Sequence, residues 1–84
     1  MVKLIWVMRM QLSFGEKVRI LRESEGINQT QLAEKVNMTQ RKISYIECDK
    51  FEPSIQDIIA LCTHFNVSAD YLLGLPKALE YPNR

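Results

Sequence analysis

The sequence predicts an all-α fold of five short helices between Ser13 and Leu75. Three observations support this prediction. Residues typical of helix starts and helix ends recur at short intervals along this stretch. Between them, apolar residues repeat every three or four positions, as they do on one face of an α-helix. After Ser13, no segment alternates apolar and polar residues as a half-buried strand does.

The first predicted helix begins after Ser13, which forms a capping box with Glu16. Its apolar face is formed by Phe14, Val18 and Leu21. Gly26 is expected to end the helix, because glycine adopts the left-handed conformation of a helix C-terminus without steric cost.

Two shorter helices follow. Asn28 is the expected N-cap of the second helix, which stops near Asn37, a residue that tolerates left-handed geometry. Thr39 caps the third helix, which ends before Asp49. The inward-facing residues of the two helices are Leu32, Ala33, Val36, Ile43 and Ile46.

The fourth helix begins at Ser54, directly after Pro53, and ends near Asn66. Its broad apolar face consists of Ile55, Ile58, Ile59, Leu61, Cys62 and Phe65. Ser68 opens a fifth helix, which Gly74 closes. Residues 13–75 therefore form the predicted domain, and residues 76–84 a C-terminal tail with at most one more helical turn.

The first twelve residues follow another pattern, with apolar side chains at every even position from Val2 to Leu12. A period of two favours a β-strand, and the backbone groups of a lone strand need a partner. The same segment of a second chain would supply one, giving a two-stranded arm across a dimer axis. A helical extension and a frayed tail are the alternatives for residues 1–12.

Composition limits the function classes. Eighty-four residues suffice for one domain, and 11 Lys and Arg against 10 Asp and Glu leave a net charge of +1. Cys48, Cys62 and His64 form no metal-ligand or catalytic pattern, so we expect no enzyme, cofactor or metal site. Cys62 is predicted to be a core residue, and Cys48 a free thiol near a helix end. No apolar run suits a membrane span or a signal peptide, so a cytoplasmic protein is expected.

The stretch from Gly26 to Pro53 carries the functional prediction. It places two short helices around a tight turn at residues 36–39, the arrangement of a helix-turn-helix. The exposed face of the second of these helices is predicted to present Gln40, Arg41, Lys42, Ser44 and Tyr45. Glutamine pairs with adenine and arginine with guanine in the major groove of DNA. A solvated polar face is the ordinary explanation for any one of these residues, but the tight two-helix unit favours DNA.

In this stretch and the one after it, the chain resembles the XRE family, the phage-repressor and Cro type of helix-turn-helix. The resemblance covers Phe14 to about Leu75. Its carriers, in order, are Gln29, Leu32-Ala33, Thr39, Ile43-Ser44, Ile46-Glu47, Lys50, Pro53-Ser54 and the segment from Val67 to Gly74.

The resemblance implies a role for each matching residue. Base contacts are expected from Gln40, Arg41 and Tyr45. Contacts to the DNA backbone are expected from Gln29, Thr39, Lys42, Ser44 and Lys50. Gln29 would also brace Gln40, and Glu47 would act inside the motif. Asp49 departs from the family by replacing its usual glycine, and we expect it to keep the left-handed turn while adding a negative charge near Lys50. Phe51 replaces a polar residue.

The resemblance implies a bacterial or phage regulator of transcription, expected to be a repressor that binds specific double-stranded DNA. One helix reads about 3–5 base pairs, so a homodimer on half-sites about 34 Å apart is expected. No sensor domain is present, so no small-molecule ligand is predicted. The alternative is a protein-interaction module, an antitoxin or co-regulator, that uses the apolar arm with Leu75, Leu79 and Tyr81.

Overall fold

The computed structural model describes residues 12–76 and 79–82, and over these residues the fold is entirely helical. Its helices are α2 (Phe14–Ser24), α3 (Gln29–Val36), α4 (Gln40–Glu47), α5 (Ile55–Phe65) and α6 (Ala69–Leu73). The five predicted helices and the all-α fold class are confirmed. Apart from Leu12, the predicted arm of residues 1–12 lies outside the described residues. In the predicted tail, residues 79–82 form no helical turn.

The predicted cap residues begin and end these helices. Each N-cap side chain accepts a hydrogen bond from the backbone N–H three residues later. These N-caps are Ser13, Asn28, Thr39, Ser54 and Ser68. Asn37 and Asn66 end α3 and α5 in the left-handed conformation, with φ of 60° and 56°, and Gly26 follows α2 with φ of 72°. Local side-chain chemistry thus sets the boundaries of the helices.

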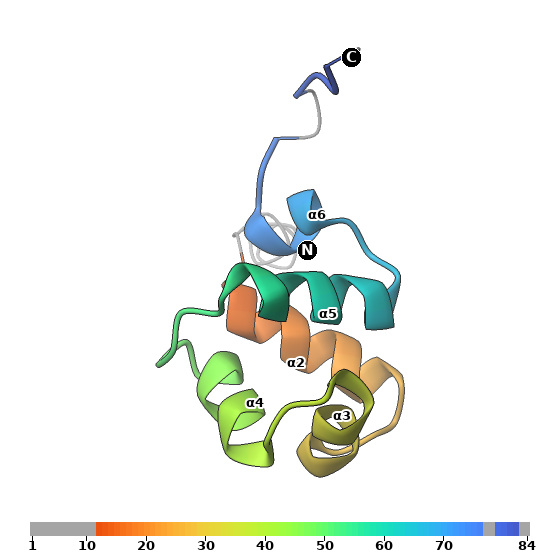
Figure 1. Ribbon diagram of the computed structural model, residues 1–84, viewed down its shortest axis with the longest axis vertical. Helices are drawn as coiled ribbons and strands as arrows, with labels where there is room; N and C mark the ends of the chain where they lie inside the picture. The colour runs from red at the N-terminus through yellow and green to blue at the C-terminus, as the bar shows by residue number, and fades with distance from the viewer. Residues whose placement is uncertain (1–11, 77–78, 83–84) are drawn as a thin grey trace, which may run out of the picture.

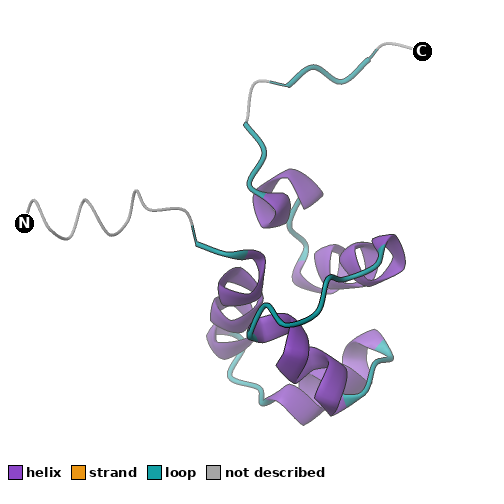
Figure 2. Ribbon diagram, turned by 90° about the vertical axis from the view of Figure 1, so that its left-hand side faces the viewer, coloured by secondary structure: helices purple, strands orange, loops and turns teal. Residues whose placement is uncertain are grey.

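The helices enclose a single small core. In Figure 1, α3 and α4 lie together at the lower end, α5 crosses above them, and α6 lies beyond α5. Figure 2 shows the same helices from the side, joined by short loops. The fully or nearly fully buried apolar residues are Val18, Leu32, Ala33, Val36, Ile43, Ile46, Leu61 and Leu72. Since each of the five helices supplies at least one residue to this core, the α3–α4 pair is fixed against the rest of the domain.

The start of α2 lies directly against the end of α4. A Cβ atom on Gly15 would lie 2.3 Å from the carbonyl oxygen of Ile46 and 2.6 Å from that of Glu47. Asp49, just past α4, accepts hydrogen bonds from the Gly15 backbone N–H at 3.0 Å and from the Ser13 hydroxyl at 2.6 Å. Only glycine allows this backbone-to-backbone approach, which sets the angle between α2 and α4.

α6 is attached to α2 by a buried lysine. The ammonium group of Lys17 donates a hydrogen bond of 2.7 Å to the carbonyl oxygen of Tyr71, and it lies 5.1 Å from the centre of the Tyr71 ring. Within the described part of the chain, no helix is long and apolar enough to cross a membrane. The same residues contain no group of three or more His, Cys, Asp or Glu side chains that could hold a metal ion.

Candidate nucleic-acid interface

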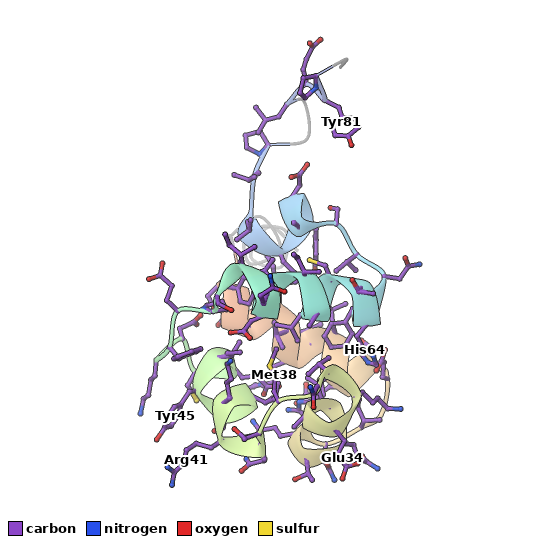
Figure 3. The ribbon with its side chains drawn as sticks, in the orientation of Figure 1. Glu34, Met38, Arg41, Tyr45, His64 and Tyr81 are labelled. Atoms are coloured by element: carbon purple, nitrogen blue, oxygen red, sulfur yellow. The ribbon has the colours of Figure 1, made fainter. Side chains whose placement is uncertain are left out.

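Helix α4 has an inner and an outer side. On the inner side, Ile43, Ile46 and Glu47 are buried. On the outer side, Gln40, Arg41 and Tyr45 are exposed. Figure 3 shows Arg41 and Tyr45 projecting from α4 away from the other helices. The helix therefore presents hydrogen-bonding side chains to solvent while its opposite side is held by the core.

Two residues predicted for this exposed face are not fully exposed. Lys42 and Ser44 are half-buried rather than exposed. The ammonium group of Lys42 lies 2.9 Å from Oδ1 of Asp57 at the start of α5, and 5.5 Å from the centre of the Phe51 ring. A long lysine stem on the edge of a helix can turn inward over apolar surface, which the residue order alone does not reveal.

Asp57 is suited to hold this lysine. Burial raises the pKa of the Asp57 carboxyl, but hydrogen bonds from Lys42 and from Ser54 outweigh it and lower the pKa below its ordinary value. Asp57 therefore stays charged and also completes the capping box of α5 with Ser54. The predicted contact of Lys42 with the DNA backbone would have to compete with this ion pair.

Glu47 is the centre of a second polar network. Its side chain is 2% exposed, and both of its oxygens accept hydrogen bonds from the Arg22 guanidinium of α2, at 2.6 and 3.1 Å. Arg22 also donates to the carbonyl oxygen of Ile27 at 2.9 Å. The hydrogen bond to Glu47 raises the pKa of Arg22 despite its burial. The expected internal role of Glu47 is confirmed.

The network continues to the outer surface through two glutamines. Gln29, the first residue of α3, donates from Nε2 to Oε1 of Glu47 at 3.0 Å. Its own Oε1 accepts a hydrogen bond of 2.7 Å from Nε2 of Gln40. The expected contact between Gln29 and Gln40 is therefore present, and it connects the exposed start of α4 to a buried carboxylate.

The other predicted backbone contacts flank α4. Thr39 is exposed, and its hydroxyl oxygen accepts the backbone N–H of Lys42, which leaves its own O–H able to donate. Lys50 is exposed, and its backbone N–H donates to the carbonyl oxygen of Tyr45 at 2.9 Å. Cys48, at the end of α4, is an exposed free thiol as expected, and Cys62 packs half-buried against the core.

Sequence reasoning missed one residue that positions α4, and the contacts of another. Arg22 was not singled out, although a buried Glu47 requires a cation and Arg22 of α2 supplies it. Asp49 adopts the expected left-handed conformation, with φ of 57°. Its carboxylate contacts Ser13 and Gly15, a link across 34 to 36 residues that no local pattern indicates.

Comparison with known proteins assigns the family. A family model described as "Helix-turn-helix" matches residues 18–72, which is more than half of the chain. This protein belongs to the XRE-type helix-turn-helix family. The turn of that motif is the segment from Asn37 to Thr39, between α3 and α4.

Two curated relatives come from a bacterium and a phage. The chain is 35% identical over 63 residues to the HTH-type transcriptional regulator ImmR of Bacillus subtilis, with 75% of this chain and 50% of the relative covered. It is 25% identical over 63 residues to the immunity repressor protein of Bacillus phage phi105, with 75% and 44% covered. The chain thus spans about half the length of these relatives.

A solved structure supports the same assignment. The P22 c2 repressor, crystallised with a synthetic operator, matches with a TM-score of 0.71 and 32% identity. The match covers 75% of this chain and 96% of the repressor chain. The helical domain described above is therefore the phage-repressor fold.

Proposed function

We propose that this protein is a transcriptional regulator, acting as a repressor, that binds specific double-stranded DNA through α4. One observation carries the proposal: Gln40, Arg41 and Tyr45 are exposed on a helix whose other side is fixed to α2 and α3. Arginine and glutamine supply the bidentate contacts that distinguish guanine and adenine in the major groove. The operator in the P22 c2 repressor structure supports the same class of ligand.

The surroundings of α4 suit contacts to DNA phosphates. Thr39 directly precedes Gln40, and Gln29 at the N-terminus of α3 accepts a hydrogen bond from Gln40. The backbone N–H of Lys50 donates to the carbonyl oxygen of Tyr45. A helix N-terminus offers backbone N–H groups and a positive dipole to an anion. We propose that Gln29, Thr39 and Lys50 contact the DNA backbone, with Ser44 and Lys42 at the edge of the interface.

The protein is proposed to act as a homodimer. One α4 helix reads about 3–5 base pairs, which is too little sequence information to select a site among many. Two copies on half-sites about 34 Å apart would double the reading length. Relatives from Bacillus subtilis and a Bacillus phage support the proposal of a bacterial or phage-encoded protein that acts in the cytoplasm.

Selection of bound sequences from a random DNA pool tests this proposal. We expect a palindromic motif whose half-sites are about one helical turn apart. Arg41→Ala should weaken binding to the selected site by about 1–3 kcal/mol and relax one base position. Equal loss on selected and random DNA would refute base reading by Arg41, and the absence of any motif would refute sequence-specific binding.

A second variant tests the backbone contact of Gln29. Gln29→Ala should weaken binding to all sequences, because Gln29 is proposed to contact phosphate, and it should also relax the base position read by Gln40, to which Gln29 is hydrogen-bonded. Because glutamine carries no charge, its loss should leave the salt dependence of binding nearly unchanged. A change in base preference alone would contradict the phosphate role of Gln29.

A protein-interaction module remains the second candidate, because apolar side chains outside α4 are exposed. Ile55 is 74% exposed, Ile59 53% and Tyr81 97%. An antitoxin or co-regulator could use such a surface to hold another protein. If the affinity for DNA does not fall steeply as the salt concentration rises, this candidate is favoured over sequence-specific DNA binding.

A further inference from the structure

Arg22 and Gln40 are connected by hydrogen bonds through Glu47 and Gln29. The directions of these hydrogen bonds support one further inference. Arg22 donates to Glu47, Gln29 donates to Glu47, and Gln40 donates to Gln29. The arrangement is a chain of four side chains in which one acceptor-only group, the buried Glu47 carboxylate, lies between Arg22 and Gln29. We call these four residues the Glu47 relay.

A carboxylate accepts hydrogen bonds and donates none, so it fixes the orientation of its neighbour. Gln29 must turn its NH₂ group toward Glu47, which it does at 3.0 Å. Its carbonyl oxygen then points the other way, toward Gln40. Only a donor can meet that oxygen, and Nε2 of Gln40 does so at 2.7 Å. With the Gln40 amide flipped, two carbonyl oxygens would face each other.

This orientation determines what Gln40 offers at the surface. One N–H of its amide is used by Gln29, which leaves Oε1 and the second N–H of Gln40 for another partner. A bidentate contact to adenine needs one acceptor and one donor in a fixed order, so a flipped amide presents the wrong order. The base preference of Gln40 therefore depends, through Gln29, on the buried carboxylate of Glu47.

We propose that Glu47 is a positioning residue for base specificity, acting through Gln29 on the amide orientation of Gln40. The proposal rests on the proposed DNA-binding function of α4 and goes beyond it by assigning specificity to a side chain that is 2% exposed. Arg22 contributes by holding both carboxylate oxygens, which keeps one of them directed at Gln29. Without Glu47, either orientation of the two amides would be allowed.

The test compares Glu47→Gln with the unchanged protein on the selected DNA site and on every single base change in it. A glutamine at position 47 keeps the shape but can donate as well as accept, so the relay loses its direction. The position read by Gln40 is first identified with Gln40→Ala. At that position we expect the base preference of Glu47→Gln to fall by about fivefold or more, and elsewhere to change less than about twofold.

Two controls separate specificity from stability. Asp57→Asn neutralises the other buried carboxylate that holds α4 and should leave the preference at the Gln40 position unchanged. In a protein that carries Gln40→Ala, adding Glu47→Gln should change no base preference further, because coupling requires both members. Equal weakening of all sequences by Glu47→Gln would overturn the proposal and leave Glu47 a stabilising residue only.

A measurement without DNA keeps the relay testable if the proposed function fails. The side-chain amide NMR signals of Gln40 should shift in Glu47→Gln and in Gln29→Leu, but not in Asp57→Asn. Unmoved Gln40 signals in Glu47→Gln would overturn the relay. If the signals shift but no DNA motif is selected, then the relay exists and its assignment to base specificity fails together with the proposed function.

Discussion

Helix α4 is held very differently on its two sides. On the α2 side, three kinds of contact converge: the Arg22–Glu47 pair, the backbone approach at Gly15, and the hydrogen bonds of Asp49. On the α5 side, the polar attachment is the Lys42–Asp57 ion pair, whose lysine side chain is 35% exposed. On the α2 side, the planar guanidinium of Arg22 binds a carboxylate that is almost fully buried. On the α5 side, the flexible ammonium group of Lys42 remains partly exposed to water.

The difference shows where the angle of α4 is decided. Buried groups that are held by two hydrogen bonds resist displacement, and so do close backbone contacts. An ion pair whose lysine is partly exposed contributes little and adapts easily. The α2 side therefore sets the direction in which Gln40, Arg41 and Tyr45 project, and the α5 side adds a weaker restraint. Variants on the two sides should differ in size accordingly.

Removing Arg22 should have the largest effect. Arg22→Met leaves Glu47 charged and buried with Gln29 as its remaining donor, which should cost about 3–5 kcal/mol in the free energy of unfolding. Urea denaturation followed by circular dichroism measures this loss. The double variant Arg22→Met with Glu47→Leu should recover most of it, because two apolar side chains leave no unpaired charge. A loss below about 1 kcal/mol in the single variant would contradict the asymmetry.

Gly15→Ala should be next in size. The added methyl group would meet two backbone carbonyl oxygens of α4, so the helices must separate. This should lower the free energy of unfolding by about 2 kcal/mol, even after the gain in helix propensity. Gly26→Ala is the matched control, since nothing lies within 4 Å of its Cβ position and its φ of 72° alone opposes substitution. That variant should lose about 1 kcal/mol. Equal thermal shifts for the two variants would mean that the close approach at Gly15 relaxes.

Asp49→Gly restores the residue that the family usually has. Glycine relieves the left-handed backbone strain but loses the two hydrogen bonds to Ser13 and Gly15, so a net loss of about 1 kcal/mol is expected. Asp49→Asn should lose less, because asparagine accepts left-handed geometry and retains one carbonyl acceptor. A gain in melting temperature for Asp49→Gly would show that these hydrogen bonds stabilise less than the strain costs.

The smallest effect is expected on the α5 side. Asp57→Asn should lower the free energy of unfolding by about 1 kcal/mol or less at pH 7. Because the fold lowers the pKa of Asp57 from its ordinary 3.8, its contribution is present above that value and is lost as the pH falls through the lowered pKa. The difference between Asp57→Asn and the unchanged protein should therefore stay constant well above pH 3.8 and shrink as the pH falls below that value.

Urea denaturation at several pH values checks this prediction, with Glu34→Gln on the exposed side of α3 as the control. A difference for Asp57→Asn that grows toward low pH would have the wrong sign for a carboxyl of lowered pKa. It would also remove the reason for treating Lys42–Asp57 as the weaker restraint on α4.

The sequence predicted those parts of the molecule that local chemistry determines. Ser13, Asn28 and Thr39 are caps whose partners lie three residues away, and Asn37 turns the chain by its own backbone preference. Ile43 and Ile46 follow helical spacing into the core. The family resemblance added the Gln29–Gln40 contact and the internal role of Glu47.

Long-range partners could not be predicted in the same way. The partners of Lys42, Glu47 and Asp49 lie 15, 25 and 34 residues away, at positions fixed only when the helices pack. Lys42 resembles its exposed neighbours by residue type, yet its side chain turns toward Asp57. Sequence reasoning identified which residues are polar on α4, and packing decided which of them remain at the surface.

The outward projection of Arg41 and Tyr45 has a consequence for how relatives can diverge (Figure 3). These two side chains extend from a helix whose angle other residues maintain, so exchanging them should change the proposed base contacts without disturbing the fold. Gln40 is different, because any replacement must also satisfy Gln29. New binding preferences should therefore arise by substitution at positions 41 and 45 first, whereas changes at position 40 should require a compensating change at position 29.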